Sequence, residues 1–431
     1  MHSDKKAPRV GPVLENKEYL TGAEAAKFLG VKPASLYAYV SRGLLSSVAP
    51  DGGRTRFYKI SDLKNLRNNQ RGMSSRDEVR DWAGPSIKSA ITEITPQGHF
   101  YRGRSALQLA EQNQDFARVV AILWDVDLDL LDSQYAYEKL DLSRSSLRAL
   151  RMFSKVLRDD ASVLEGLKLF VPILEMCEPA PVSLNSADVL QHGVDLIYAM
   201  TCALAYIFKT KSSEKFKVQA NSISLAQGLS LALGRKSKKA ELEYINKALV
   251  LCADHELNAS AFSARLAAST GATLHASVLA ALATFSGTLH GGASTRFENI
   301  VLTAMQFDST TKWLREISRS GSLSEIKRSG SELYPDGDPR ARLLLEQALE
   351  LAPESRDLAA LMALLEYLKK NRQIEPTLDA GLAAMRFALR LPPGAGAAVF
   401  AIARTAGWIA HAREQQLFGV QIRPRAKYIG S

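Results

Sequence analysis

Apolar residues recur every three to four positions through most of the chain after residue 105, which is the spacing that one face of an α-helix requires. The spacing predicts helices over residues 105–115, 143–159, 185–208, 240–251, 260–270, 275–285, 338–351 and 355–371. Residues 90–101 differ, because apolar and polar residues alternate there around Pro96-Gln97-Gly98, and this alternation predicts a β-hairpin. We therefore expect one all-α unit with a small hairpin at its entrance.

The N-terminal part of the chain contains two short apolar segments separated by a tight turn. Thr21 and Glu24 have the spacing of a capping box at the start of the first segment, and Gly30 ends it. Pro33 opens the second segment, which ends at Gly43. Two short helices joined in this way form a helix-turn-helix.

A Gly-Gly turn follows these two helices. It lies in DGGRTRFY, beside β-prone residues, and predicts a hairpin or wing, after which Ser61-Asp62 caps a third helix. Together, residues 18–70 resemble the MerR-like winged helix-turn-helix. That resemblance implies DNA contacts from the second helix and from the wing, through Ser35, Tyr37, Tyr39, Arg42, Arg54 and Arg56. A helix-turn-helix that makes only protein contacts is the alternative, since a fold alone does not give a function.

Positive charge is concentrated in this N-terminal part. Residues 1–72 hold 13 Lys or Arg and 6 Asp or Glu, a net charge of +7, whereas the remaining residues hold 42 and 39, a net charge of +3. A local basic excess favours a polyanionic partner such as DNA, and a solvated basic face is the alternative. Residues 71–89 are polar, contain Gly and Pro, and are predicted to be a linker.

The composition is that of an ordinary globular protein, with 46% hydrophobic and 23% charged residues. Three cysteines without a CxxC pair exclude a disulfide framework and a cysteine-cluster metal site, and they favour a reducing compartment. The N-terminus lacks the apolar core of a signal peptide. The most apolar segment, 189–208, carries His192, Gly193 and Asp195, so we expect a buried core helix, no membrane span and a cytoplasmic protein.

Two short polar segments interrupt the helical pattern near the middle of the chain. The first is CADHELN at 252–258, whose Asp-His-Glu triplet is also of a kind that caps or cross-links helices. The second is GTLHGGA at 287–293, where two glycines after His290 allow a ligand or a backbone to approach closely. The apolar helix before His290 would keep the imidazole neutral and able to donate one hydrogen bond. A purely structural turn is the alternative for this segment.

Two arginines occupy positions that suit an anion. In YPDGDPRA, Asp338 is a natural N-cap and Pro339 a natural first helical residue, which places Arg340 in the first turn of a helix. Arg340 there would complete an anion site at the helix N-terminus, or it would lie on the surface. Arg404 lies in the middle of AAVFAIARTAGWIAH, which is apolar almost all round. A buried guanidinium needs a carboxylate, from the protein or from a substrate.

Taken in order, these segments resemble the citrate synthase family. From about residue 90 to residue 425 the chain carries ADHE, HGGA, LYPDGDPRA, a lone aspartate in PTLDAG, ARTAGWIAH and RPR. It is most similar to bacterial citrate and 2-methylcitrate synthase-like proteins that carry an N-terminal MerR-like domain. The resemblance implies a mainly α, two-domain helical fold preceded by a small winged helix-turn-helix. The implied domains are the helix-turn-helix at 1–70, the linker at 71–89, a large helical domain at 90–291 and 391–431, and a small helical lid at 292–390.

The resemblance implies condensation of an acyl-CoA, acetyl- or propionyl-CoA, with a 2-oxo acid such as oxaloacetate. Asp379 would remove the α-proton of the thioester, and neutral His290 would hydrogen-bond the enolate oxygen. His255 is a further substrate-binding match. Arginines would bind the substrate carboxylates, the last of them reaching in from the other subunit of a homodimer: Arg340, Arg404 and Arg423. We expect neither a metal nor a cofactor beside the acyl-CoA substrate.

Two positions depart from the pattern of the family. Ser331 stands where the family places a histidine that polarises the oxo-acid carbonyl and protonates the new alkoxide. A serine hydroxyl donates a hydrogen bond but is not cationic at pH 7. Cys252 stands where many members have an oxo-acid-binding histidine. The acyl-CoA half of the site is therefore better preserved than the oxo-acid half.

Two functions follow from these observations. The first is a citrate synthase-like acyltransferase, impaired by Ser331 or directed to a different acceptor. The alternative is a transcriptional regulator, in which a degraded synthase domain binds an acyl-CoA or a di- or tricarboxylate and the helix-turn-helix reads DNA. A homodimer suits both, since helix-turn-helix dimers read paired half-sites. We favour the enzyme.

Overall fold

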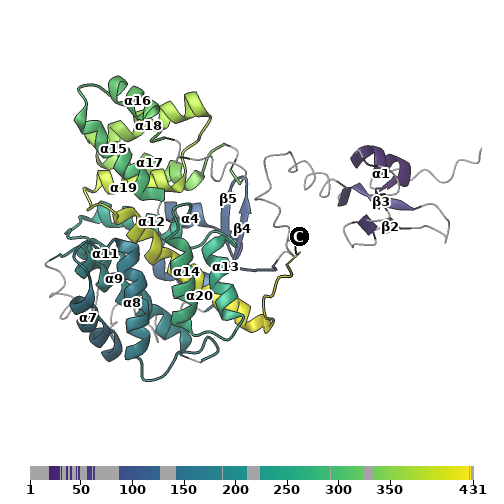
Figure 1. Cartoon of the computed structure of the whole chain (residues 1–431), viewed down its shortest axis with the longest axis horizontal. Coiled ribbons are helices and arrows are strands. Elements are labelled where there is room, and N and C mark those ends of the chain that lie inside the picture. Colours follow the sequence, from purple (N-terminus) through teal and green to yellow (C-terminus); the bar gives the residue numbers. More distant parts are fainter. Residues whose placement is uncertain are drawn as a thin grey trace, which may run out of the picture. The chain divides into compact units, whose positions relative to one another are not determined.

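The chain divides into two units, Met1–Ile87 and Lys88–Ser431. The structure is a computed structural model of the whole chain (Figure 1). It describes residues 19–29, 31, 35–36, 39–40, 45, 47–48, 56–60, 62–63, 87–126, 142–186, 188–210, 224–291, 293–323, 326, 333–334, 336–426 and 428. The predicted linker at 71–89 lies outside these residues except for its last three positions.

The first unit contains a small antiparallel sheet and a helix. Strand β1 (Tyr19–Thr21) leads into α1 (Gly22–Leu29), and β2 (Ser47–Val48) and β3 (Phe57–Lys59) complete a sheet of order β1-β3-β2. The predicted capping box is present, since the Thr21 amide donates to Glu24 Oε2 at 2.9 Å and the Glu24 amide donates back to Thr21 Oγ1. Pairing of β2 with β3 confirms the predicted wing.

The second unit opens with the predicted hairpin. Strands β4 (Thr92–Thr95) and β5 (Gly98–Tyr101) pair antiparallel, and the short β6 (Arg104–Ser105) joins them in the order β4-β5-β6. Gly98 has φ +138°, a backbone conformation that a residue with a side chain rarely adopts, and this explains the glycine at the turn.

Helices make up the rest of the described second unit. The first nine are α4 (Ala106–Glu111), α5 (Phe116–Trp124), α7 (Arg144–Val156), α8 (Val163–Cys177), α9 (Val189–Ile207), α11 (Leu225–Ala232), α12 (Lys239–Cys252), α13 (Ala259–Ala268) and α14 (Leu274–Phe285). They are followed by α15 (Ala293–Leu302), η3 (Thr303–Gln306), α16 (Thr310–Arg319), α17 (Pro339–Leu351), α18 (Arg356–Arg372), α19 (Leu378–Ala388) and α20 (Ala395–Phe418). The eight helices that the sequence predicts are all present.

Three predicted helices are too long, two of them mainly at one end, since α7 ends at Val156 and α9 begins at Val189. The helix expected over 105–115 ends at Glu111, because Asp115 does not extend it but caps the next helix. The Asp115 carboxylate accepts a hydrogen bond from the Ala117 amide at 2.7 Å, which satisfies a backbone donor at the start of α5.

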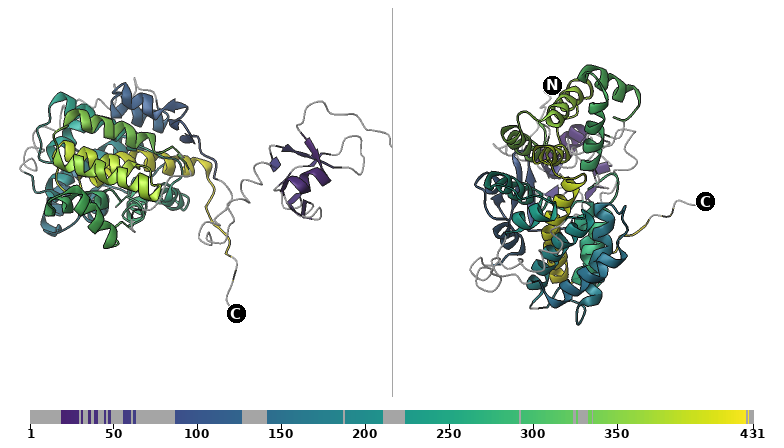
Figure 2. Two further views of the ribbon diagram at one scale, coloured as in Figure 1. Left: turned by 90° about the horizontal axis from the view of Figure 1, so that it is seen from above. Right: turned by 90° about the vertical axis from the view of Figure 1, so that its left-hand side faces the viewer.

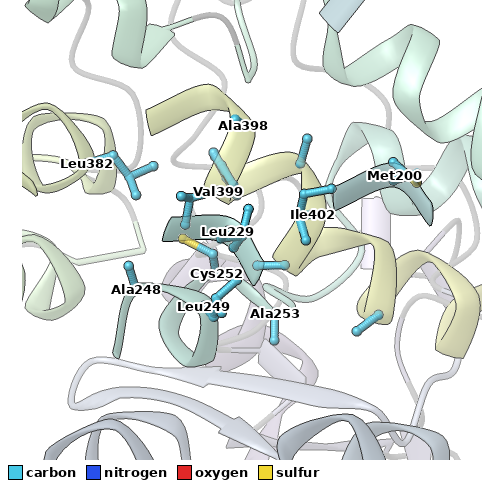
Figure 3. Packing of buried hydrophobic residues seen from close by; sticks show 14 of the residues in the cluster. Met200, Leu229, Ala248, Leu249, Cys252, Ala253, Leu382, Ala398, Val399 and Ile402 are labelled. Atoms are coloured by element: carbon cyan, nitrogen blue, oxygen red, sulfur yellow. The ribbon is translucent and has the colours of Figure 1, made fainter. Parts of the chain in front are cut away.

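Helix α20 is the centre of the second unit. It is buried almost throughout and packs against α9, α12, α13 and α14, and Figure 2 shows it in yellow between the teal and green helices. At its contact with α12, Figure 3 shows Val399 and Ile402 close to Leu249 and Cys252. Helix α9 is a buried core helix, as predicted, and within the described ranges no helix has the length and hydropathy that a membrane span requires.

Helices α15 to α19 gather at one end of the second unit (Figure 1). Helix α17 packs on α19, and α15 packs on both α18 and α19. This group meets the other helices where α17 and α19 contact α12 and where α19 contacts α20. The proposed limits of a lid, residues 292 and 390, remain a prediction.

Candidate active site

A cavity of about 490 Å³ lies in the second unit where these two groups of helices meet. One set of lining residues comes from the α12–α13 connection, the turn after α14 and helix α20. The other set comes from the segment before α17 and from residues 373–379 at the start of α19. The cavity brings together five residues that the sequence singles out: His255, His290, Arg340, Asp379 and Arg404.

Asp379 is the second residue of α19. Its Oδ1 atom is buried and has no hydrogen-bond partner among the described residues. Burial raises the pKa of Asp379 to about 6, and the nearby Arg340 guanidinium limits the rise. A carboxylate with a raised pKa and a free oxygen has the properties of a general base near neutral pH.

His290 lies in the tight turn that follows α14. Gly291 donates its amide to Phe285 O, and a Cβ at Gly291 would lie 2.2 Å from the Phe285 ring, so only glycine fits this turn. The imidazole packs edge-on against the same ring. Burial lowers the pKa of His290 to about 4, with Arg404 adding to the effect. The imidazole is therefore neutral at pH 7.

The orientation of His290 depends on residues that sequence reasoning missed. His290 Nε2 lies 2.9 Å from Ser260 Oγ, which also accepts a hydrogen bond from Trp408 Nε1 at 3.0 Å. The single Ser260 proton has two acceptors within reach, Asn258 Oδ1 at 2.7 Å and His290 Nε2. When the proton goes to His290, the imidazole carries its own proton on Nδ1 and can donate it to a ligand.

Arg340 is fixed at the start of α17. The residue is only 6% exposed, and its guanidinium binds the Asp338 carboxylate through two hydrogen bonds, Nε to Oδ1 at 3.0 Å and Nη2 to Oδ2 at 2.7 Å. Burial alone would lower the pKa of Arg340, but Asp338 reverses this and the net shift is upward. The alternative of a surface arginine is thus wrong, and Asp338 holds the guanidinium in one orientation in the wall of the cavity.

Arg404 is 1% exposed and lies in the middle of α20. Its Nε donates to the backbone oxygen of Cys252 at 2.8 Å, and the guanidinium stacks over the Phe400 ring. Its Nη2 has no partner, and within the described part of the chain no carboxylate lies in ion-pair range of Arg404. Of the two sources of an anion that the sequence left open, the geometry favours a ligand in the cavity.

Asp254, the first residue of the Asp-His-Glu triplet, cross-links distant elements near Arg404. Its Oδ2 accepts hydrogen bonds from Thr92 Oγ1 at 2.6 Å and from His411 Nε2 at 3.3 Å. Arg265 can only donate, and its Nη1 lies 3.1 Å from His411 Nδ1, so the His411 proton is on Nε2. Burial would raise the pKa of Asp254, but His411 and Arg404 hold it below its usual value. Asp254 therefore supplies a buried negative charge near Arg404.

Two other residues predicted for the synthase site, Cys252 and Arg423, do not line this cavity. The Cys252 thiol lies in the apolar core (Figure 3), where burial raises its pKa to about 12. Cys252 contributes to the site only through its backbone oxygen, which accepts from Arg404. Arg423 is exposed in the tail after α20, and its placement in a partner's site stays a prediction. Ser331 lies outside the described residues.

The predicted DNA contacts fall partly in the described first unit. Arg56 is exposed and donates to Ser47 Oγ at 3.0 Å, Tyr39 packs against the small core, and Ser35 is half-buried. The others lie outside the described residues: Tyr37, Arg42 and Arg54. Across the residues that the structure describes, no group of three or more His, Cys, Asp or Glu side chains is placed to hold a metal ion.

Known proteins resemble both parts of the chain. A family model described as "Citrate synthase, C-terminal domain" matches residues 82–425, and one described as "Helix-turn-helix domain" matches residues 19–71. Citrate synthase 2 of Bacillus subtilis is 24% identical over 352 residues, which cover 79% of this chain and 93% of that protein. The 2-methylcitrate synthase 1 of Corynebacterium glutamicum is 24% identical over 355 residues, which cover 79% and 92%.

A solved structure shows the same fold. Citrate synthase from Thermoplasma acidophilum, in a ternary complex with carboxymethyl coenzyme A and oxaloacetate, has a TM-score of 0.67 to this chain at 21% identity. The match covers 83% of this chain and 97% of that chain. The citrate synthase family model covers the part of the chain that forms the cavity, whereas the helix-turn-helix model covers the first unit.

Proposed function

Because this chain belongs to the citrate synthase family, we propose that it condenses an acyl-CoA, acetyl- or propionyl-CoA, with a 2-oxo acid such as oxaloacetate. The observation that carries the proposal is the pairing of Asp379 with His290 in one cavity. The first is a carboxylate whose pKa of about 6 suits proton removal, and the second is a histidine that stays neutral at pH 7.

The first chemical step is removal of an α-proton from the thioester. Asp379 accepts this proton through its unpartnered oxygen, and negative charge develops on the thioester oxygen. His290 donates a hydrogen bond to that oxygen when Ser260 donates to Nε2. A donor held in place by Ser260 and Trp408 needs little reorganisation as the charge develops, which is the main source of oxyanion stabilisation.

The two buried arginines bind the carboxylates of the oxo acid. Arg404 offers Nη2, and Arg340 is held in the cavity wall by Asp338. The nucleophilic carbon then attacks the carbonyl carbon of the bound oxo acid, which gives a larger CoA thioester. Water from the solvent then cleaves this thioester, so that the tricarboxylic acid and free CoA are released. A homodimer, in which Arg423 of each subunit completes the other subunit's site, is part of this proposal.

The test is CoA release by the purified protein with acetyl-CoA or propionyl-CoA plus oxaloacetate. We expect turnover by the wild type and a loss of at least 10²-fold in Asp379→Asn, since a general base contributes about 10²–10⁴-fold. Asp336→Asn is the matched control, because Asp336 precedes α17 but does not line the cavity. Equal rates for the wild type and Asp379→Asn would contradict the proposal.

A Ser331→His variant tests whether the lost histidine limits the rate. If general acid catalysis is weak in the wild type, restoring the imidazole raises kcat by about 10²-fold or more. If the wild type already turns over fast, the variant leaves kcat unchanged, and another group supplies the proton.

We also propose that the first unit binds DNA. The proposal is supported by the helix-turn-helix match, the paired β2–β3 wing and the net charge of +7 over residues 1–72. The measurement is the affinity of the full chain for duplexes from the region upstream of its own gene at several salt concentrations, with and without acyl-CoA. Arg56→Ala should reduce the salt slope by about 1 if Arg56 contacts a phosphate. No shift of any upstream fragment would contradict the proposal.

A further inference from the structure

Tyr334 is a buried residue of the cavity and has no role in the chemical steps proposed above. It lies in the segment before α17, is 3% exposed, and lines the cavity that also contains Asp379 and His290. Its hydroxyl is 2.8 Å from His255 Nε2, across 79 residues of sequence. This hydrogen bond joins the segment before α17 to the α12–α13 connection, so it links the two sets of lining residues.

The number of protons on His255 and Tyr334 exceeds the number that their mutual hydrogen bond uses. Neutral His255 carries one ring proton and Tyr334 one hydroxyl proton, and their mutual hydrogen bond uses one of the two. If Tyr334 donates to Nε2, the proton on His255 Nδ1 is left over. If His255 donates from Nε2, the phenol proton is left over. In both cases one acidic proton remains for a third acceptor.

The surroundings keep His255 neutral and place a cation near the phenol. Burial and the Arg340 guanidinium hold the pKa of His255 well below its usual value. Burial raises the pKa of Tyr334 to about 12, and Arg340, which lies 5.9 Å from the centre of the Tyr334 ring, opposes the rise. Arg340 thereby stabilises a developing phenolate, while the neutral imidazole can pass a proton from one nitrogen to the other.

His99 and Tyr101 hold His255 in place. The ring of His99 packs edge-on against it with centroids 5.4 Å apart, and His99 Nε2 is 3.0 Å from the Tyr101 hydroxyl. Tyr101 donates to Val250 O and accepts from the Asp254 amide, which fixes the backbone immediately before His255. His255 and Tyr334 are therefore a positioned pair.

We propose that Tyr334, paired with His255, is a further catalytic residue that protonates the carbonyl oxygen of the oxo acid as the new carbon–carbon bond forms. The inference rests on the proposed condensation. The C–H bond of the thioester breaks and its proton goes to Asp379. The carbanion forms the C–C bond, and the carbonyl π electrons move to oxygen, which takes the phenol proton of Tyr334 while His255 donates from Nε2 to the phenolate that remains. Asp379 then returns its proton to solvent, and solvent reprotonates the pair.

Tyr334→Phe removes only the hydroxyl and is measured in two reactions. The first is condensation of acetyl-CoA with oxaloacetate, followed as CoA release. The second is exchange of the acetyl-CoA methyl protons in D₂O with malate present, because malate offers the same carboxylates but no carbonyl to attack. Tyr367→Phe is the matched control, since its hydroxyl also makes a hydrogen bond, to Ser318 Oγ at 2.9 Å, but does not line the cavity.

We expect Tyr334→Phe to lower kcat for condensation by about 10²-fold while proton exchange stays within about threefold of the wild type. Tyr367→Phe should change neither rate. Unchanged condensation in Tyr334→Phe, or an equal loss of condensation and exchange, would overturn the inference. Exchange without condensation in the wild type would also overturn it, while the acyl-CoA half of the proposed function would survive. Absence of both reactions in the wild type would overturn the proposed function and the inference together.

Discussion

The residues around the cavity show how one environment shifts two titratable groups in useful directions. Burial disfavours the charged form of both. It raises the pKa of the Asp379 carboxylate towards neutrality and lowers that of the His290 imidazole away from it. Arg340 moderates the first shift and Arg404 strengthens the second. The base and the hydrogen-bond donor thus acquire their states from burial in the same cavity, and a different arginine adjusts each pKa.

These shifts predict how the rate depends on pH. A general base works only when it is deprotonated, so kcat/KM should fall about tenfold per pH unit below about 6, where Asp379 becomes protonated. Protonation of His290 should not lower kcat/KM further until the pH falls to about 4. The check is a profile of CoA release from pH 4.5 to 8. A rate that stays constant down to pH 4.5 would contradict the assignment of Asp379.

At the scale of elements, helical periodicity and capping residues were sufficient to predict many of the helices and the hairpin, whereas α5, α8, α11, α15 and α16 were not predicted. Asp338 and Pro339 begin α17 as expected, and the apolar run around Arg404 is the buried helix α20. Asp115 shows the limit of the method, because a capping aspartate between two short helices resembles a polar position within one longer helix.

Contacts between distant elements could not be derived from periodicity. The sequence shows His255 and Tyr334 as members of two motifs, but only the fold places one against the other. The same holds for Asp254 and His411, which are separated by 157 residues. Periodicity also does not show that Cys252, the last residue of α12, turns its thiol into the core and presents only its backbone oxygen to Arg404.

The contact between α20 and the α12–α13 connection depends on a single glycine. Gly407 donates its amide to Ala253 O at 3.2 Å, and a Cβ there would lie 2.4 Å from Asp254 Oδ1 and 2.6 Å from Ala253 O. We expect Gly407→Ala to destabilise the second unit by about 2–3 kcal/mol, because backbone must move to relieve the clash. The measurement is the midpoint of thermal unfolding. A midpoint within one degree of the wild type would show that the contact is not rigid.

At the scale of the whole molecule, the two units have separate hydrophobic cores. The core of the first unit includes Ala25, Leu36 and Tyr58, and no described residue of the second unit belongs to it. Every described residue that lines the cavity comes from the second unit. The catalytic proposal therefore requires nothing from the helix-turn-helix.

A chain restricted to residues 88–431 tests this independence. We expect it to fold and to release CoA within about twofold of the full chain, since it keeps the whole cavity and its core. Circular dichroism and the CoA assay are the measurements. A folded but inactive product would show that the first unit contributes to the site.

The central claim is that Asp379 and His290 activate the α-carbon of an acyl-CoA, and proton exchange measures this step alone. The experiment follows loss of the methyl signal of acetyl-CoA by NMR in D₂O, with malate present, for the wild type and Asp379→Asn. We predict exchange by the wild type and at least 10²-fold slower exchange by the variant. No exchange by the wild type, or equal exchange by the two proteins, would contradict the account.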